Sequence, residues 1–216
     1  MKLLIVSGGY TDFDFAIDLI KKSGFEIIIA ADSGLNFFKA ADITPDVVVG
    51  DFDSVNQEVL SYYRDNEFID FHVLNPEKDD TDTEYAIRFA IEKGADSITI
   101  LGGTGTRLDH VMGNITLLGI GIEYDVSIEM IDAFNRIRVF NKSFTIKKEE
   151  QFGKYISLIP FMGPVKGVTI KGMKYCLDNY DMSGFNSLGI SNEISEDIAS
   201  VEFEDGIMLV IESRDY

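Results

Sequence analysis

The sequence offers very little cysteine, histidine or tryptophan chemistry. Its 216 residues include one cysteine, two histidines and no tryptophan. The lone thiol, Cys176, excludes an intramolecular disulfide and a cysteine-based zinc site, and we expect it to be a small core residue of a protein in the reducing cytoplasm. His72 and His110 are too few for a histidine-rich metal site, and no nucleophile-elbow motif accompanies them.

Positive charge is also scarce. The chain has 19 Lys and Arg against 37 Asp and Glu, a formal net charge of -18. Nucleic acids and anionic membranes both need a cationic surface, so we expect neither as a partner. A polyphosphate ligand would need a divalent cation between itself and the carboxylates.

Long apolar runs are absent as well. None approaches the ~20 residues of a membrane span. The apolar start of the chain ends at Gly8 and Gly9, without the length and cleavage site of a secretory signal, so we interpret it as a first strand.

Up to residue 132, short apolar runs alternate with stretches of helical spacing. This pattern predicts an α/β domain with a mainly parallel sheet over residues 1–132. The expected strands are 3–7, 26–31, 47–50, 69–74, 97–101 and 126–131. The expected helices are 12–23, 34–41, 56–66, 81–93 and 108–121.

From residue 133 onward, the pattern changes to period-two alternation with glycine turns. We therefore expect a second domain over residues 133–216, an all-β antiparallel sandwich. Its expected strands are 135–141, 155–161, 165–170, 173–177, 198–204 and 207–212. Asp205-Gly206 lies between the last two and predicts a hairpin.

Acidic and glycine-rich clusters follow the expected strands of the first domain. They are Asp32-Ser33-Gly34, Asp51-Phe52-Asp53, Lys78-Asp79-Asp80-Thr81-Asp82 and the run from Gly102 to Asp109. The carboxyl ends of parallel strands form the ligand crevice of such sheets, so these carboxylates should be crowded together. Crowded carboxylates imply a bound hard cation, most simply Mg²⁺.

Within the second cluster, the spacing of Asp51 and Asp53 is informative. In an extended chain, residues two apart point to one side, which would turn Phe52 away from both carboxylates. Each cluster alone also has a structural explanation. Thr81 and Glu84 form a capping box that would account for nearby acids, and the other clusters could be turns and helix caps.

The run from Gly102 to Arg107 has the features of a phosphate-binding turn. Glycines permit close backbone approach, the following helix offers free N–H groups, and Arg107 supplies a planar cation. A Walker A sequence is absent, and so is the dinucleotide fingerprint after the first strand.

Taken in order, these motifs resemble the thiamine pyrophosphokinase family. The resemblance rests on AADSGLNFF at 30–38, TPDVVVGDFDSV at 44–55, NPEKDDTDTEYAI at 75–87 and GGTGTRLDHVMGN at 102–114. SNE at 191–193 and FEDGIMLVI at 203–211 are similar to the family's second domain. The resemblance covers nearly the whole chain and implies a homodimer with the active site between subunits. Each subunit would have an α/β ATP-binding domain and a thiamine-binding, dimer-forming β-sandwich.

The resemblance also implies roles for particular residues. Asp51, Asp53 and Asp82 would hold Mg²⁺ and the phosphates, with Asp109 close by. The residues expected to face ATP are Asp32, Ser33, Gly34, Gly102, Gly103, Thr104 and Arg107. Those expected near thiamine are Lys78, Ser191 and Asn192. Relatives often place a tryptophan against thiamine, and in this chain Tyr175 is a candidate replacement.

The implied reaction moves the diphosphate of ATP onto the thiamine hydroxyl and releases AMP. Positioning and charge stabilisation would carry most of the catalysis, and either Asp82 or Asp109 could accept the proton. One alternative is a haloacid-dehalogenase-type phosphatase with Asp51 and Asp53 as nucleophile and acid, although that pair normally follows the first strand. The other is a sensor that binds nucleotide or thiamine without turnover.

Overall fold

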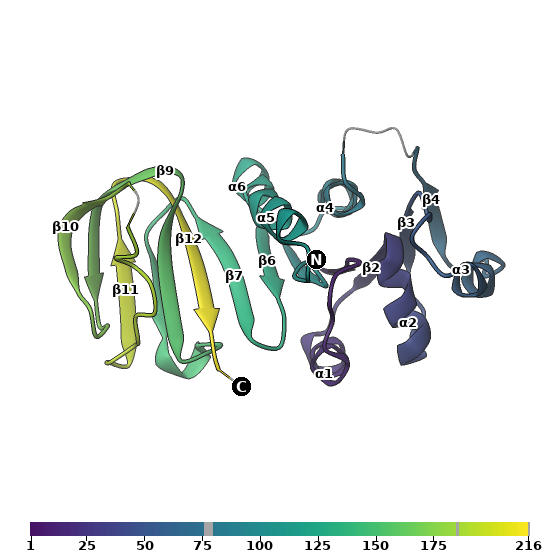
Figure 1. Ribbon diagram of the computed structural model, residues 1–216, viewed down its shortest axis with the longest axis horizontal. Helices are drawn as coiled ribbons and strands as arrows, with labels where there is room; N and C mark the ends of the chain where they lie inside the picture. The colour runs from purple at the N-terminus through teal and green to yellow at the C-terminus, as the bar shows by residue number, and fades with distance from the viewer. Residues whose placement is uncertain (76–79, 185, 216) are drawn as a thin grey trace. The chain divides into compact units, whose positions relative to one another are not determined.

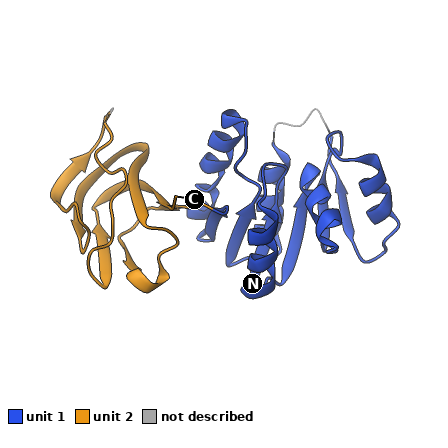
Figure 2. Cartoon of the chain, turned by 60° about the horizontal axis from the view of Figure 1, so that its bottom comes forward, with its two compact units in different colours: residues 1–133 blue, residues 134–216 orange. Residues whose placement is uncertain are grey.

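The chain folds into two compact units. The structure is a computed structural model that describes residues 1–75, 80–184 and 186–215 (Figure 1). The units are Met1–Ala133 and Phe134–Tyr216 (Figure 2).

The first unit is built on a parallel sheet. Its strands are β1 (Lys2–Val6), β2 (Ile27–Ala31), β3 (Val47–Gly50), β4 (Asp70–Val73), β5 (Ser97–Leu101) and β6 (Ser127–Ile131). They lie in the order β4-β3-β2-β1-β5-β6, and each neighbouring pair is parallel. Leu3 to Val6 of β1 are fully buried, as expected of an apolar strand covered on both faces.

Helices connect these strands. They are α1 (Phe13–Ser23), α2 (Leu35–Ala41), α3 (Gln57–Arg64), α4 (Asp82–Glu92), α5 (Leu108–Leu117) and α6 (Ile120–Tyr124), with a short 3-10 helix η1 (Asp32–Gly34). Asp12 and Thr81 cap α1 and α4 by accepting backbone N–H groups three residues on. The helix expected at 108–121 is two helices, because glycines at 119 and 121 weaken its continuation. Across the described residues, no helix combines the length and apolarity that a membrane span requires.

The second unit is antiparallel, so the architecture as a whole is mixed. Its strands are β7 (Asn135–Phe140), β8 (Phe144–Lys147), β9 (Tyr155–Lys171), β10 (Leu177–Met182), β11 (Ile198–Glu202) and β12 (Asp205–Ser213), with a 3-10 turn η2 (Lys148–Glu150). The 17-residue β9 pairs with β12 along its first half and with β10 and β11 along its second. Side chains from both halves, including Ile156 and Val168, enter one core.

The hairpin expected at Asp205-Gly206 is wrong. Strands β11 and β12 both pair antiparallel with β9, so they run in the same direction, and Asp205 already belongs to β12 opposite Lys166 in the register that β11 begins. Between the two strands, the Glu204 N–H donates to the Lys166 carbonyl of β9 at 2.9 Å. Strands β11 and β12, which the predicted turn would have paired with each other, therefore both pair with β9.

Two further expectations in this unit are wrong. Residues 155–161 and 165–170 are one continuous strand, and 173–177 is an irregular segment that leads into β10. Because this segment lies outside the strands, Cys176 is exposed rather than a core residue.

One ionic cluster lies inside the second unit. Glu212 is fully buried and accepts hydrogen bonds from Arg136 Nε (2.9 Å) and Nη2 (2.7 Å), Arg138 Nη2 (2.6 Å) and the Phe152 N–H (2.9 Å). Burial by itself raises the pKa of Glu212. The Arg136 and Phe152 hydrogen bonds and both guanidinium charges outweigh this effect and hold the pKa below its usual range. Glu212 therefore joins β7 and β12 through charge as well as through the sheet.

Glu212→Gln should lower the free energy of unfolding by about 3 kcal/mol near neutral pH, because it leaves two half-buried guanidiniums without their carboxylate. Since the folded pKa is depressed, the stabilisation is present above the unfolded pKa of about 4.3 and is lost as pH falls through the folded value. Urea unfolding of wild type and variant between pH 3 and 7 measures both effects.

The matched control is Glu202→Gln, which removes an exposed ion pair with Lys171 (3.5 Å). It should cost less than about 1 kcal/mol. Equal losses for the two variants would contradict the structural role of Glu212.

Candidate functional site

The connections after β1, β2, β3 and β5 meet at the carboxyl edge of the parallel sheet. Gly9 N–H donates to the Gly102 carbonyl and Tyr10 N–H to the Thr104 carbonyl, both at 2.8 Å. A Cβ on Gly9 would lie 2.2 Å from the Thr104 oxygen, so this approach requires glycine. The same edge brings Gly50 against Asp32, where a Cβ would lie 3.1 Å from the Asp32 Cα.

Three carboxylates gather at this edge. Asp32 lies just after β2, Asp51 just after β3, and Asp82 begins α4. Each offers an oxygen within 4.8 Å of the other two, and all three residues are partly buried. The start of α4 is fixed to the end of β1 by a buried 2.9 Å hydrogen bond between the Ser7 and Thr83 hydroxyls. The cap and the carboxylate cluster thus coexist at the start of α4.

Asp32 is the most constrained of the three. Its backbone lies in the left-handed region (φ 47°), and its Oδ1 is buried without a hydrogen-bond partner. Burial raises the pKa of Asp32, and the negative charges of Asp82 and Asp51 raise it further. A buried, unpartnered carboxylate oxygen facing two other carboxylates fits a hard divalent cation such as Mg²⁺.

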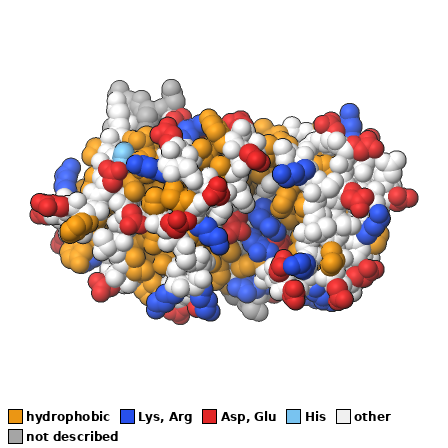
Figure 3. Space-filling view, turned by 180° about the vertical axis from the view of Figure 1, so that it is seen from behind, with side chains coloured by type: hydrophobic (Ala, Val, Ile, Leu, Met, Phe, Trp, Pro, Cys, Tyr) orange, Lys and Arg blue, Asp and Glu red, His pale blue; other side chains and the backbone are white. Residues whose placement is uncertain are grey.

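The distribution of charged residues between the two units also agrees with a cation site in the first unit. Residues 1–133 carry 25 of the acids and 9 of the bases, whereas residues 134–216 carry 12 acids and 10 bases. Nearly all of the excess negative charge therefore belongs to the unit that holds the carboxylate cluster. Acidic and basic side chains are interspersed over the face drawn in Figure 3, so the excess forms no single patch on that face.

Asp53 lies beside this cluster but outside it. The expected extended geometry of residues 51–53 is wrong, because Phe52 is left-handed (φ 65°). Phe52 is buried and packs edge-on against Phe71, with ring centroids 6.2 Å apart, and this anchor forces the turn. Asp53 is exposed and its N–H donates to Asp51 Oδ1 at 3.2 Å, while the Asp51 charge raises the Asp53 pKa.

Arg107 and Asp109 form a bidentate pair next to the glycine-rich turn. Arg107 Nε donates to Asp109 Oδ1 at 3.2 Å and Nη2 donates to Oδ2 at 2.6 Å. This pairing lowers the Asp109 pKa to about 2. Asn114 Nδ2 also donates to the Gly103 carbonyl at 2.8 Å and so orients the turn. The sequence analysis assigned Asn114 no role. Its position on α5, one helical turn after His110, is what could have indicated that it lies beside the glycine-rich turn.

The residues expected near thiamine are in part outside the described residues, since Lys78 falls in 76–79 together with Asp79. Ser191 and Asn192 lie in the second unit. Ser191 is left-handed (φ 56°), and its N–H donates to Ser157 Oγ at 3.1 Å. Asn192 is buried, and its side chain bonds the backbone of Tyr175.

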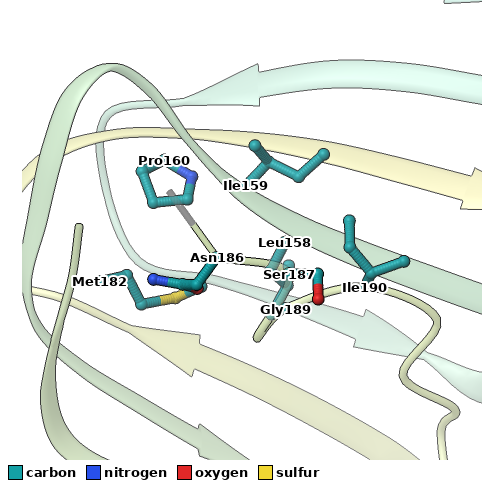
Figure 4. Close-up of a pocket in the computed structure, with 8 residues that line it drawn as sticks. All are labelled: Leu158, Ile159, Pro160, Met182, Asn186, Ser187, Gly189 and Ile190. Carbon is teal, nitrogen blue, oxygen red and sulfur yellow. The ribbon is translucent and has the colours of Figure 1, made fainter. Parts of the chain in front are cut away.

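A hollow in the second unit lies near β9, with Leu158, Met182 and Ile190 in its lining (Figure 4). Its volume of about 60 Å³ is far below the roughly 300 Å³ at which ligand pockets begin. We therefore do not assign a ligand to it.

Fold and cluster together define a class: an α/β protein whose parallel sheet carries, at its carboxyl edge, a carboxylate cluster suited to a hard cation beside glycine-rich connections. Comparison with known proteins narrows this class. Residues 19–130 match the family model "Thiamin pyrophosphokinase, catalytic domain", and residues 143–208 match "Thiamin pyrophosphokinase, vitamin B1 binding domain".

Individual relatives agree. The chain is 37% identical to thiamine pyrophosphokinase of Bacillus subtilis (strain 168) over 188 residues, 87% of each chain. The solved structure of thiamine pyrophosphokinase from Bacillus subtilis superposes with a TM-score of 0.89 at 33% identity, covering 100% of both chains. That from Geobacillus thermodenitrificans gives 0.84 at 32% identity, covering 100% of this chain and 98% of the other. The chain belongs to the thiamine pyrophosphokinase family.

Magnesium should raise the melting temperature of the protein, because a cation relieves repulsion within the cluster. Asp32→Asn should raise the melting temperature of the metal-free protein and shrink the Mg²⁺ effect; each kcal/mol is worth about 2–4 °C at this chain length. Since folding raises the Asp32 pKa, metal-free stability should fall as pH rises through that pKa in wild type but not in the variant.

Differential scanning calorimetry with EDTA or Mg²⁺ measures these shifts. Asp65→Asn, at the exposed end of α3, is the matched control and should respond to Mg²⁺ as wild type does. An Asp32→Asn protein with an undiminished Mg²⁺ response would remove Asp32 from the cation site.

Proposed function

We propose that this protein transfers the diphosphate of ATP to the hydroxyl of thiamine, giving thiamine diphosphate and AMP, with Mg²⁺ as its cofactor. The supporting observation is that a member of the thiamine pyrophosphokinase family crowds Asp32, Asp51 and Asp82 at the carboxyl edge of its parallel sheet. Polyphosphate and carboxylates can share that edge only across a divalent cation.

In this proposal the first unit binds ATP. Asp32, Asp51 and Asp82 would hold the cation, and the exposed Asp53 would be a further carboxylate near it. The turn from Gly102 to Arg107 and the segment from Asp32 to Gly34 receive the nucleotide. Arg107 exchanges its Asp109 partner for phosphate oxygens, since guanidinium binds both groups bidentately.

The chemistry forms one bond and breaks one. The thiamine hydroxyl oxygen bonds to the β-phosphorus, the bond from that phosphorus to the oxygen shared with the α-phosphate breaks, and AMP leaves with that oxygen. Bound Mg²⁺ supplies neutralisation of the polyphosphate charge. A carboxylate accepts the hydroxyl proton. The two candidates for this base are Asp82 and Asp109.

Thiamine is proposed to bind the second unit, for which the matching family model is the vitamin B1 binding domain. Ser191, Asn192 and Lys78 are the proposed neighbours of thiamine, with Tyr175 as its aromatic contact. We further propose that this unit is a two-layer β-sandwich that forms the homodimer, that the active site lies between subunits, and that the protein works in the cytoplasm.

Incubation with ATP, Mg²⁺ and thiamine, followed by chromatography, should yield AMP and thiamine diphosphate one for one. Asp51→Asn should lower kcat by at least about 100-fold, because the cation loses a charged ligand. Asp65→Asn should leave kcat unchanged.

Other products identify other functions. ADP with thiamine monophosphate would contradict diphosphate transfer, and orthophosphate alone would indicate the phosphatase alternative with Asp51 as nucleophile. Binding of both ligands without any product would indicate a sensor.

A further inference from the structure

The side chain of Asn192 is hydrogen-bonded mainly to the backbone of Tyr175. Its Oδ1 accepts the N–H of Tyr175 (3.0 Å) and that of Glu193 (2.9 Å), and its Nδ2 donates to the Tyr175 carbonyl (2.8 Å). An asparagine amide offers two donors and two acceptor sites, so three of the four are used within the protein. Both backbone groups of Tyr175 are thereby bonded to a single side chain.

Asn192 is itself fixed to the core of the second unit. It is 4% exposed, and its backbone exchanges two hydrogen bonds with Ile156 of β9, at 2.8 and 2.9 Å. Ile156 is fully buried. Asn192 therefore connects the backbone of Tyr175 to the buried strand β9 by hydrogen bonds.

Tyr175, by contrast, is 58% exposed. An exposed ring contributes little burial energy, so folding alone does not require a fixed backbone beneath it. The Lys174 Nζ lies over the ring, 5.3 Å from its centroid, and is paired with Glu193 at 3.3 Å, so this contact restrains the ring itself. A rigidly mounted, accessible aromatic ring is a preorganised contact for a flat cationic ligand.

We propose that Asn192 is a positioning residue, which acts on thiamine by fixing Tyr175 rather than by binding thiamine through its own amide. This inference rests on the proposed function, in which thiamine binds the second unit. It changes the role implied for Asn192 by family resemblance, because three of the four hydrogen-bonding positions of its amide are already used within the protein.

Because the chain has no tryptophan, Tyr175→Trp creates a single fluorescent reporter at the ring in question. Thiamine should quench its emission on titration without ATP. Adding Asn192→Ala should lower the fluorescence anisotropy of the reporter and raise the thiamine Kd about tenfold. In the chain that keeps Tyr175, Asn192→Ala should raise the thiamine KM similarly and change kcat at saturating thiamine by less than about twofold.

Two further variants serve as controls for Asn192→Ala. Asn192→Asp retains the acceptor for both N–H groups and should recover most of the anisotropy and affinity, even if the alanine variant folds poorly. Asn141→Ala, in the exposed turn between β7 and β8, should change neither.

A fall in affinity with unchanged anisotropy in Asn192→Ala would overturn the proposal, because it would assign a direct ligand contact. Unchanged affinity would overturn it too. If thiamine does not change the emission of the reporter while wild type still makes thiamine diphosphate, this inference fails and the proposed function stands. If wild type makes no thiamine diphosphate, the proposed function fails.

Discussion

Repulsion among three carboxylates is the constraint around which the first unit is organised. Asp32, Asp51 and Asp82 hold oxygens within 4.8 Å of one another, and Asp32 Oδ1 is buried without a hydrogen-bond partner. Such an arrangement costs free energy in the folded, metal-free protein. It persists because two buried strands and a capped helix fix the backbone at each position, and because glycines let the neighbouring connections pack against them.

Backbone strain lies at the same places. Asp32 and Phe52 are left-handed beside the carboxylates, and Ser191 is left-handed beside Asn192. Non-glycine residues in such conformations cost about 1–3 kcal/mol each and persist only where surrounding contacts hold them. Phe52 is held by its burial against Phe71, and Ser191 by its bond to Ser157. In both units, therefore, a specific contact holds a residue in a left-handed turn next to a residue of the candidate site.

Local signals predicted much of the first unit. The strands at Val47–Gly50 and Ser97–Leu101 have the bounds that their apolar runs indicate, and Thr81 caps α4 as its sequence predicts. The convergence of Asp32, Asp51 and Asp82 was expected because each belongs to a cluster that follows a predicted strand of a parallel sheet. The left-handed turn at Phe52 did not, because it depends on Phe71, which lies on another strand.

Non-local contacts explain the misses in the second unit. Asp205-Gly206 has the composition of a hairpin turn, but β11 and β12 both run antiparallel to β9 and pair with it instead of with each other. Residues 173–177 alternate like a strand, yet the Asn192 side chain takes the backbone bonds of Tyr175 that a strand partner would need. No pattern within either segment reveals those partners, which lie far along the chain.

The central claim is that the Asp32, Asp51 and Asp82 cluster holds the divalent cation that carries the polyphosphate. Crystals grown with Mn²⁺ and a non-hydrolysable ATP analogue test it directly through anomalous diffraction. We expect an anomalous peak within about 2.5 Å of oxygens from at least two of these carboxylates, touching the analogue's phosphates. Bound analogue with its metal elsewhere, or with no metal at this edge of the sheet, would contradict the claim.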